Sequence, residues 1–251
     1  AARGVRAEGF EEGLASGDVV YAVDYLTEQT RALLEGREPA ISAEGKDVVV
    51  IGGGDTGNDC MGTAVRQGAR TVRQLEYGPC APEVRAASNA WPEWPNVKKT
   101  DYGQEEAIAL QGDDLREWCA DTQRVLLDSD GHVRGLQVHS LDWSAGKPSA
   151  VEGSEREIDA QLVLVACGFA GPERGVFDAF GVPVATTGRP LPVMEGGATG
   201  AAAATHRAEL AEDAAAAGRA AVYVAGDARN GSSLVVSSMA DALKCAAEVA
   251  V

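Results

Sequence analysis

The chain has 251 residues, of which 45% are hydrophobic, so it can bury one large core or two smaller ones. Its formal net charge of −16 argues against a general surface for nucleic acid or anionic membranes, because both require clustered Lys and Arg. No apolar run approaches the roughly 20 residues of a membrane-spanning helix, and no signal-type hydrophobic core follows Ala1. We therefore expect a soluble protein with no membrane or nucleic-acid partner. The chain does not begin with Met, as expected for part of a longer polypeptide.

The cysteines are scattered and form no C-x-x-C pair. This spacing gives no local support for a zinc site or an iron–sulfur cluster, so we expect no metal in this chain. Reduced thiols are the favoured interpretation, which predicts the cytoplasm or the interior of an organelle. No second Cys or neighbouring base supports a catalytic thiol at Cys167, and we predict no catalytic side chain. The cysteines are Cys60, Cys80, Cys119, Cys167 and Cys245.

The first predicted element is a helix over residues 19–35. Asp18 is the expected N-cap residue, and Gly36 is the expected stop. The spacing places an apolar stripe on one side of this helix, with Tyr25 and Gln29 beside it. The stripe consists of Ala22, Leu26 and Leu33.

A glycine-rich turn after the next predicted strand dominates the sequence. Residues 48–51 are all β-branched and run directly into glycines, and helix-compatible residues follow. Gly52, Gly54 and Gly57 fit G-x-G-x-x-G. The first glycine permits the turn, the second lets backbone approach a pyrophosphate, and the third lets the helix pack against its strand. We therefore predict a dinucleotide whose phosphates lie at the helix N-terminus. The predicted contacts are Gly52, Gly53, Gly54, Asp55, Thr56, Gly57 and Asn58.

A second predicted strand, residues 71–75, ends at Glu76. This position lies about 20 residues beyond the glycine turn, where a Rossmann unit places the carboxylate that binds the adenosine ribose. A carboxylate there repels a 2′-phosphate, which favours NADH over NADPH. The alternative is a solvated acid at a strand end.

Residues 78–102 are dense in Pro and Trp and include Trp91-Pro92-Glu93-Trp94-Pro95. Proline removes backbone donors and restricts the preceding residue, so we predict an ordered loop. Its tryptophans either cover the edge of a core or contact a ligand or a partner domain. A short helix over 104–111 is expected next, and alternating apolar residues then predict an antiparallel meander inserted in a parallel fold. The meander strands are expected near residues 124–127, 133–143 and 155–158.

The apolar run 161–166 is typical of a buried parallel strand. It ends in small residues that can approach a cofactor, so Ala166, Cys167 and Gly168 join the predicted contacts. Residues 196–221 are low in complexity, and we expect a surface insertion without chemistry. Within it, a helix over 205–217 and a solvated His206 are predicted.

The last predicted strand, residues 221–227, ends in Gly226-Asp227, and a helix over 234–249 closes the chain. A carboxylate at a strand end can bind a sugar hydroxyl, and a helix N-terminus can face an electron-rich ring. The alternative is that Asp227 merely caps the next turn.

Together these stretches resemble the flavin-dependent disulfide-reductase-like superfamily and, more narrowly, the glutamate synthases. The match is to the small subunit, or to the C-terminal region of the fused NADH-dependent enzyme. The Trp-Pro segment is the most specific part, since general members of the superfamily lack it. The resemblance is carried by residues 20–27, 49–60, 74–76, 91–103 and 226–236.

The resemblance implies an α/β flavoprotein with two dinucleotide-binding domains, in which a Rossmann-like NAD(P)H domain is inserted in an FAD domain. Residues 1–42 would be a connecting helix from the FAD domain, residues 43–168 the NAD(P)H domain, and residues 169–251 the last FAD segment. The family's N-terminal FAD motif and cysteine-rich region have no counterpart here. The resemblance therefore implies one part of a larger enzyme.

The resemblance further implies that this part takes hydride from NADH onto FAD. Iron–sulfur clusters in the missing or partner region would carry the electrons to the large subunit, which makes glutamate from glutamine and 2-oxoglutarate. The cofactors supply this chemistry, and the protein positions them. The alternatives are the electron-input module of another NAD(P)H-dependent flavin oxidoreductase, such as a pyrimidine reductase, and a non-catalytic scaffold. The flavin contacts implied by position are Gly226, Asp227, Ser233, Leu234 and Val235.

Overall fold

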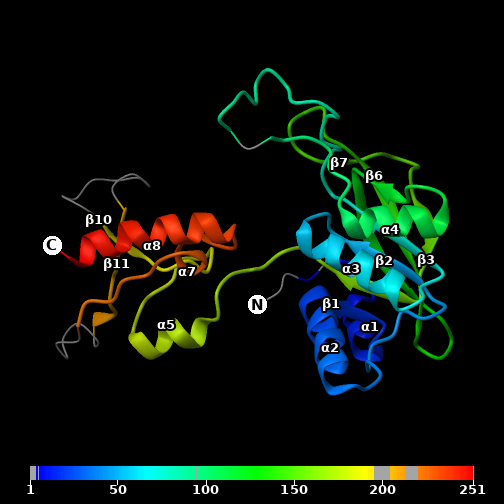
Figure 1. Cartoon of the computed structure of the whole chain (residues 1–251), viewed down its shortest axis with the longest axis horizontal. Coiled ribbons are helices and arrows are strands. Elements are labelled where there is room, and N and C mark those ends of the chain that lie inside the picture. The colour runs from blue at the N-terminus through cyan, green and yellow to red at the C-terminus, as the bar shows by residue number, and fades with distance from the viewer. Residues whose placement is uncertain (1–3, 5, 94, 195–203, 213–219, 251) are drawn as a thin grey trace. The chain divides into compact units, whose positions relative to one another are not determined.

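The computed structural model describes residues 4, 6–93, 95–194, 204–212 and 220–250. The chain divides into two compact units, of which one is Gly4–Cys167 and the other contains Gly168–Val251 (Figure 1). No helix among the described residues is long and apolar enough to cross a membrane.

The larger unit is built on a five-stranded sheet with the strand order β1-β9-β2-β3-β4. Every neighbouring pair in this sheet is parallel. Alternate side chains of the central strand face opposite sides, so Val48 and Val50 join one core and Val49 joins the other. The strands are β1 (Val19–Tyr21), β2 (Asp47–Ile51), β3 (Thr71–Leu75), β4 (Arg116–Glu117) and β9 (Leu162–Val165).

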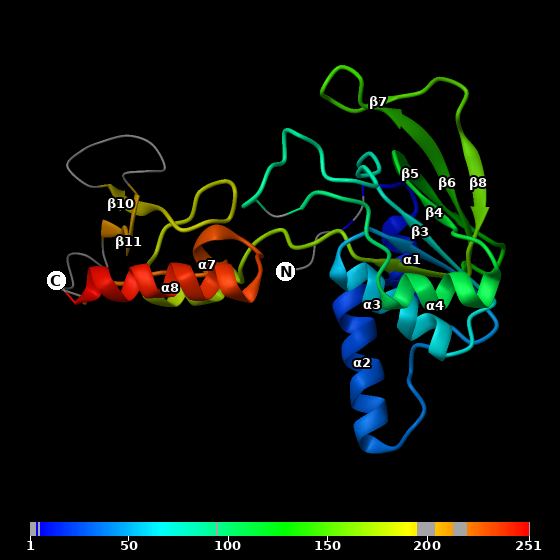
Figure 2. The ribbon, with the colours of Figure 1, turned by 45° about the horizontal axis from the view of Figure 1, so that its top comes forward.

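One face of this sheet is covered by helices α2 (Ala22–Glu35), α3 (Asp55–Arg66) and α4 (Tyr102–Gln111) (Figure 2). Tyr25 and Met61 pack there against the sheet. Helix α4 begins at a capping box formed by Asp101 and Gln104, as the sequence Asp-x-x-Gln favours.

The other face of the sheet packs against an antiparallel meander, with α1 (Phe10–Ser16) at its side. Leu136 and Val138 of the meander are fully buried in this second core, together with Val163 of the parallel sheet. The prediction of a meander within a parallel fold is thus confirmed. Its strands are β5 (Ala120–Leu127), β6 (Val133–Asp142), β7 (Ser149–Ala150) and β8 (Arg156–Asp159).

The C-terminal unit has a small core to which Phe177, Val182 and Val224 contribute. A two-stranded antiparallel pair, β10 (Pro192–Met194) and β11 (Ala204–Ala208), lies in this unit. Its described helices are α5 (Arg174–Phe180), α7 (Asp227–Asn230) and α8 (Val235–Val249). Helix α8 confirms the predicted last helix, and it buries none of its residues within this structure.

The predicted helix over residues 19–35 is wrong in its first turn. Val19–Tyr21 is strand β1, because these residues pair in parallel with β9. Asp18 therefore does not cap the helix; its Oδ2 accepts a hydrogen bond from the Val133 backbone N–H at 3.1 Å. Leu33, predicted on the apolar stripe, is 72% exposed, and the neighbouring Ala32 is buried instead.

Two predictions for the C-terminal unit are also wrong. Residues 205–208 belong to strand β11 rather than to a helix, because they pair with β10; residues 213–217 lie outside the described part of the chain. The apolar segment 221–227 forms only an isolated bridge, between Tyr223 and Arg207, before α7 begins at Asp227.

His206 is not solvated, as the sequence had suggested, but is 5% exposed. Its Nδ1 lies 2.5 Å from Glu248 Oε1, and its Nε2 lies 3.1 Å from Asp241 Oδ1. The two carboxylates share a face of α8, seven residues apart, and they allow the ring to be buried between strand and helix.

Candidate dinucleotide site

The glycine turn joins β2 to α3, and its glycines are required for different physical reasons. Gly52 has φ 112°, and a Cβ there would lie 2.4 Å from the Ala166 carbonyl oxygen. At Gly57 a Cβ would lie 2.3 Å from the Gly52 carbonyl oxygen, so this glycine lets the helix approach the strand end. At Gly54 a Cβ would meet nothing within 4 Å. The turn and the packing thus explain two of the glycines, whereas the space beside Gly54 is open to a ligand.

A cavity of about 240 Å³ lies at the N-terminal end of α3. Helix α3 has Gly54 as its N-cap residue, and no side chain caps it. Its first amide groups therefore lack a side-chain acceptor, and the partial positive charge of the helix end favours an anion there. Predicted contacts that line the cavity are Gly53, Gly54, Asp55, Asn58 and Glu76.

Glu76 follows β3, as predicted, and its carboxylate lies against the glycine turn. A Cβ on Gly53 would come within 1.0 Å of Glu76 Oε1, so only glycine leaves room for this carboxylate. Burial raises the pKa of Glu76, and the positive charge of Arg116 opposes that rise.

Asn58 uses its side chain within the protein although it lines the cavity. Its Oδ1 accepts hydrogen bonds from the backbone N–H groups of Gly103 at 3.0 Å and Gln104 at 3.2 Å. Asn58 is 4% exposed and joins α3 to the start of α4. Its assignment as a nucleotide contact stays a prediction.

Three other predicted contacts of this unit lie beside the turn or in the first turn of α3. Ala166 packs its carbonyl against Gly52, and the Cys167 Sγ lies 3.5 Å from the Ile51 carbonyl oxygen. Thr56 is half-buried in the first turn of α3. Ala166, Cys167 and Thr56 do not line the cavity.

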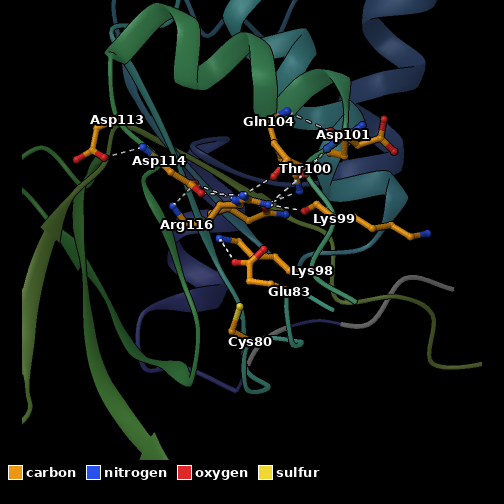
Figure 3. Close-up of polar contacts among 12 residues, drawn as sticks. Cys80, Glu83, Lys98, Lys99, Thr100, Asp101, Gln104, Asp113, Asp114 and Arg116 are labelled. Atoms are coloured by element: carbon orange, nitrogen blue, oxygen red, sulfur yellow. Dashed lines mark hydrogen bonds and ion pairs between the residues drawn. The ribbon is translucent and has the colours of Figure 1, made fainter. Parts of the chain in front are cut away.

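The far side of the cavity is formed by residues that the sequence did not single out. Lys98 lies 5.2 Å from the centre of the Trp118 ring, and the Arg116 guanidinium lies 5.4 Å from it. Lys98 also pairs with Glu83 at 3.4 Å (Figure 3). Strand β4, which carries Arg116, was not predicted because two residues show no periodicity. The Pro- and Trp-dense loop was the available signal, since Lys98 lies within it.

Trp91 of that loop is 85% exposed, so it covers no core edge within this structure. Trp94 lies outside the described residues. The cavity is reached instead by the two ends of the loop. The loop residues that line it are Pro79, Ala81, Val97, Lys98, Lys99 and Asp101.

The predicted flavin contacts lie in the C-terminal unit. Gly226 has φ 62°, and its N–H donates to Asp241 Oδ2 at 2.8 Å. Asp227 Oδ1 accepts from the Ser233 backbone N–H at 3.1 Å and from the Ser233 and Ser238 hydroxyls, each at 2.8 Å. These hydrogen bonds lower the pKa of Asp227 and fix the entry to α8. Leu234 and Val235 at that entry are exposed. Gly168 is exposed as well.

No disulfide joins the five cysteines, all of which lie in described parts of the chain. Within those parts, no three His, Cys, Asp or Glu side chains gather into a group that could hold a metal ion.

The larger unit has the arrangement of a Rossmann-type nucleotide-binding domain: a parallel sheet, a glycine turn after its central strand, and a carboxylate at the end of the next strand. The solved structure of the Mycobacterium tuberculosis oxidoreductase FprA has a similar fold, with a TM-score of 0.59 over 100% of this chain and 61% of that chain. The sequence identity is 14%, so this likeness shows the fold alone.

No family model matches the chain. Comparison with curated proteins nevertheless shows that the chain is homologous to glutamate synthase. It is 37% identical over 242 residues to glutamate synthase [NADH] of Schizosaccharomyces pombe, covering 93% of this chain and 11% of that protein. It is 37% identical over 246 residues to the glutamate synthase [NADPH] small chain of Bacillus subtilis, covering 95% of this chain and 46% of that protein. The chain thus spans about half the length of a small chain and about a tenth of the longer enzyme. These matches confirm the resemblance inferred from the sequence.

Proposed function

We propose that this chain is the part of a glutamate synthase that binds NADH and passes its hydride to FAD. The observation that carries the proposal is the glycine turn, where Gly54 and the uncapped start of α3 face an open cavity. The homology supports the identity of the enzyme, because it extends over nearly the whole chain.

The residues of the turn fit a nicotinamide dinucleotide. The first amides of α3 would hold the pyrophosphate, the space beside Gly54 would admit it, and the Glu76 carboxylate would accept from the ribose hydroxyls. The bound dinucleotide would supply a hydride. The protein contributes position and the exclusion of water, so no acid or base is required of a side chain here.

Glu76 supports NADH as the preferred nucleotide, because its charge opposes a 2′-phosphate. The relatives do not decide the nucleotide preference, because one is named for NADH and the other for NADPH. Lys98 lines the same cavity and carries the opposite charge. Titration calorimetry of the chain with each nucleotide in turn is the direct test, and equal or tighter binding of NADPH would contradict the assignment of Glu76.

The flavin half of the proposal rests on the turn at Gly226 and on the start of α8. Gly226 would approach the FAD pyrophosphate and Asp227 the ribitol, while Ser233, Leu234 and Val235 would face the ring. The exposed residues of α8 and the relatives' greater length both support a contribution from further polypeptide. That region or a partner would supply the rest of the FAD site and the iron–sulfur clusters, and the synthase large chain would receive the electrons.

Flavin absorbance tests this half of the proposal. The complete polypeptide should contain one FAD per chain and reduce a dye with NADH. A complete polypeptide that binds NADH but purifies colourless, even with added FAD, would favour a scaffold that retains the fold.

A further inference from the structure

Three polar side chains form a buried hydrogen-bond network at the dinucleotide cavity, and two of them, Gln104 and Arg116, also line it. We call Gln74, Gln104 and Arg116 the Gln–Gln–Arg network. They are 0%, 6% and 7% exposed, respectively. Buried polar groups are costly unless they are hydrogen-bonded, so the partners of this network indicate what it does.

The network begins at the glycine turn. Gln74 Nε2 donates to the Gly52 carbonyl oxygen at 2.9 Å, and Gln104 Nε2 donates to Gln74 Oε1 at 3.1 Å. Arg116 Nη1 then donates to Gln104 Oε1 at 3.3 Å. One side chain each from β3, α4 and β4 thus forms a continuous series of hydrogen bonds that begins at the Gly52 carbonyl.

The network ends at loop residues 99–101, and Figure 3 shows Arg116 beside Lys99 and Thr100. Arg116 donates from Nη1 to the Lys99 carbonyl oxygen at 2.7 Å and from Nη2 to the Thr100 Oγ1 at 2.9 Å. The Asp114 carboxylate neutralises the Arg116 guanidinium, with Oδ2 lying 2.7 Å from Nη2. Gln104 Oε1 also accepts from the Asp101 backbone N–H at 2.8 Å, which fixes the same segment a second time.

The two glutamine amides can satisfy these partners in only one orientation. Gln104 Oε1 faces two donors, so its Nε2 must point to Gln74. Gln74 therefore offers its oxygen to Gln104 and its nitrogen to Gly52. Apolar side chains of similar size would fill the space but would fix no such direction, so packing alone does not explain the choice of residues.

We propose that the Gln–Gln–Arg network consists of positioning residues that set the separation between the glycine turn and loop residues 97–101 before the nucleotide binds. The inference rests on the proposed function, since it assigns the cavity to a dinucleotide. Gly53 and Gly54 line one side of that cavity, and Lys98, Lys99 and Asp101 line the other. A network that fixes both sides preorganises the site and lowers the conformational cost of binding.

The test uses Gln104→Met and Gln74→Met, alone and combined, in the full 251-residue chain. NADH affinity is measured by calorimetry, and amide hydrogen exchange of residues 97–101 is followed without nucleotide. We expect each single variant to weaken NADH binding about ten-fold and to speed exchange in that loop. The double variant should bind NADH about as weakly as either single variant, because either change alone already interrupts the chain of hydrogen bonds between the glycine turn and the loop. Additive losses would indicate two independent packing effects and would overturn the inference.

Thr100→Val provides a variant that keeps the buried residues intact. Thr100 is exposed, and the change removes only its hydroxyl contact with Arg116. We expect NADH binding to weaken several-fold without a change in the unfolding midpoint, and unchanged affinity would overturn the inference even if the methionine variants fail to fold. Arg156→Gln is the matched control, because Arg156 pairs with Glu117 away from the cavity; it should leave NADH affinity unchanged. If the unmodified chain binds neither NADH nor NADPH, the proposed function itself fails, which is a separate outcome.

Discussion

Replacing Gly54 by Val should abolish dinucleotide binding while leaving the protein folded. Gly54 has φ −74° and ψ −178°, an extended conformation that Val adopts without strain. An added Cβ there meets nothing within 4 Å, so the side chain enters the space beside the start of α3. The loss of stability should be about 1 kcal/mol, since Val is a poorer N-cap residue than Gly.

The loss of binding should be much larger. A side chain in that space keeps the pyrophosphate from the first amides of α3. Hydrogen bonds to charged groups contribute about 1.5 to 3 kcal/mol each, so the loss of two costs at least about 3 kcal/mol. At about 1.4 kcal/mol per decade, NADH affinity should fall by a factor of 100 or more. Calorimetric titration measures this directly, with circular dichroism as the check of folding.

Gly57→Ala is the matched comparison within the same motif. Its Cβ would lie 2.3 Å from the Gly52 carbonyl oxygen, so the change strains the protein itself. Overpacking costs about 1 to 3 kcal/mol, and the better helix propensity of Ala returns about 1 kcal/mol. The net loss of stability in Gly57→Ala is therefore about 0 to 2 kcal/mol, a range that includes the loss of about 1 kcal/mol expected for Gly54→Val, so the two variants should have similar unfolding midpoints. Unaltered NADH affinity in Gly54→Val would refute the role assigned to the glycine turn.

Three further predictions concern nucleotide choice and flavin binding. Glu76→Ala should narrow the preference for NADH over NADPH by about 1 to 3 kcal/mol, the scale of an unmade polar contact, as measured by titration with both nucleotides. Because burial raises the pKa of Glu76, its carboxyl is protonated at a higher pH than that of an exposed Glu. The preference of the unmodified chain for NADH over NADPH should therefore decline as the pH falls. A ratio of NADH affinity to NADPH affinity that stays constant from neutral to acid pH would contradict the role of Glu76. Residues 1–251 alone should bind NADH but retain no stoichiometric FAD and reduce no dye, because the proposed flavin contacts at Asp227 and the start of α8 face only the ribitol and the ring. A yellow, active preparation of this chain would show a complete flavin site.

The sequence by itself determined the elements whose signals are local. The β-branched run before Gly52, the spacing of the glycines, and the strand ending at Glu76 predicted β2, the turn, α3 and β3 where the structure has them. The meander was predicted in outline from alternation, although β5 begins at Ala120 rather than near residue 124 and the short strand β7 was not predicted. Helix α8 was predicted from helix-forming residues. These features depend on neighbours within a few residues, so the pattern of one segment carries enough information.

Only the tertiary structure decided the features that depend on distant partners. The local sequence of Val19–Tyr21 is compatible with a helix, but in the folded chain this segment pairs with β9. The local sequence around His206 offers no partner, but in the folded chain two carboxylates of α8 contact its ring. Lys98 and the buried Arg116, which line the far side of the cavity, belong to segments that show no periodicity. A two-residue strand brings Arg116 to the cavity. Pairing energy and burial arise from contacts that the folded chain alone creates, so no local pattern could have assigned these residues to the site.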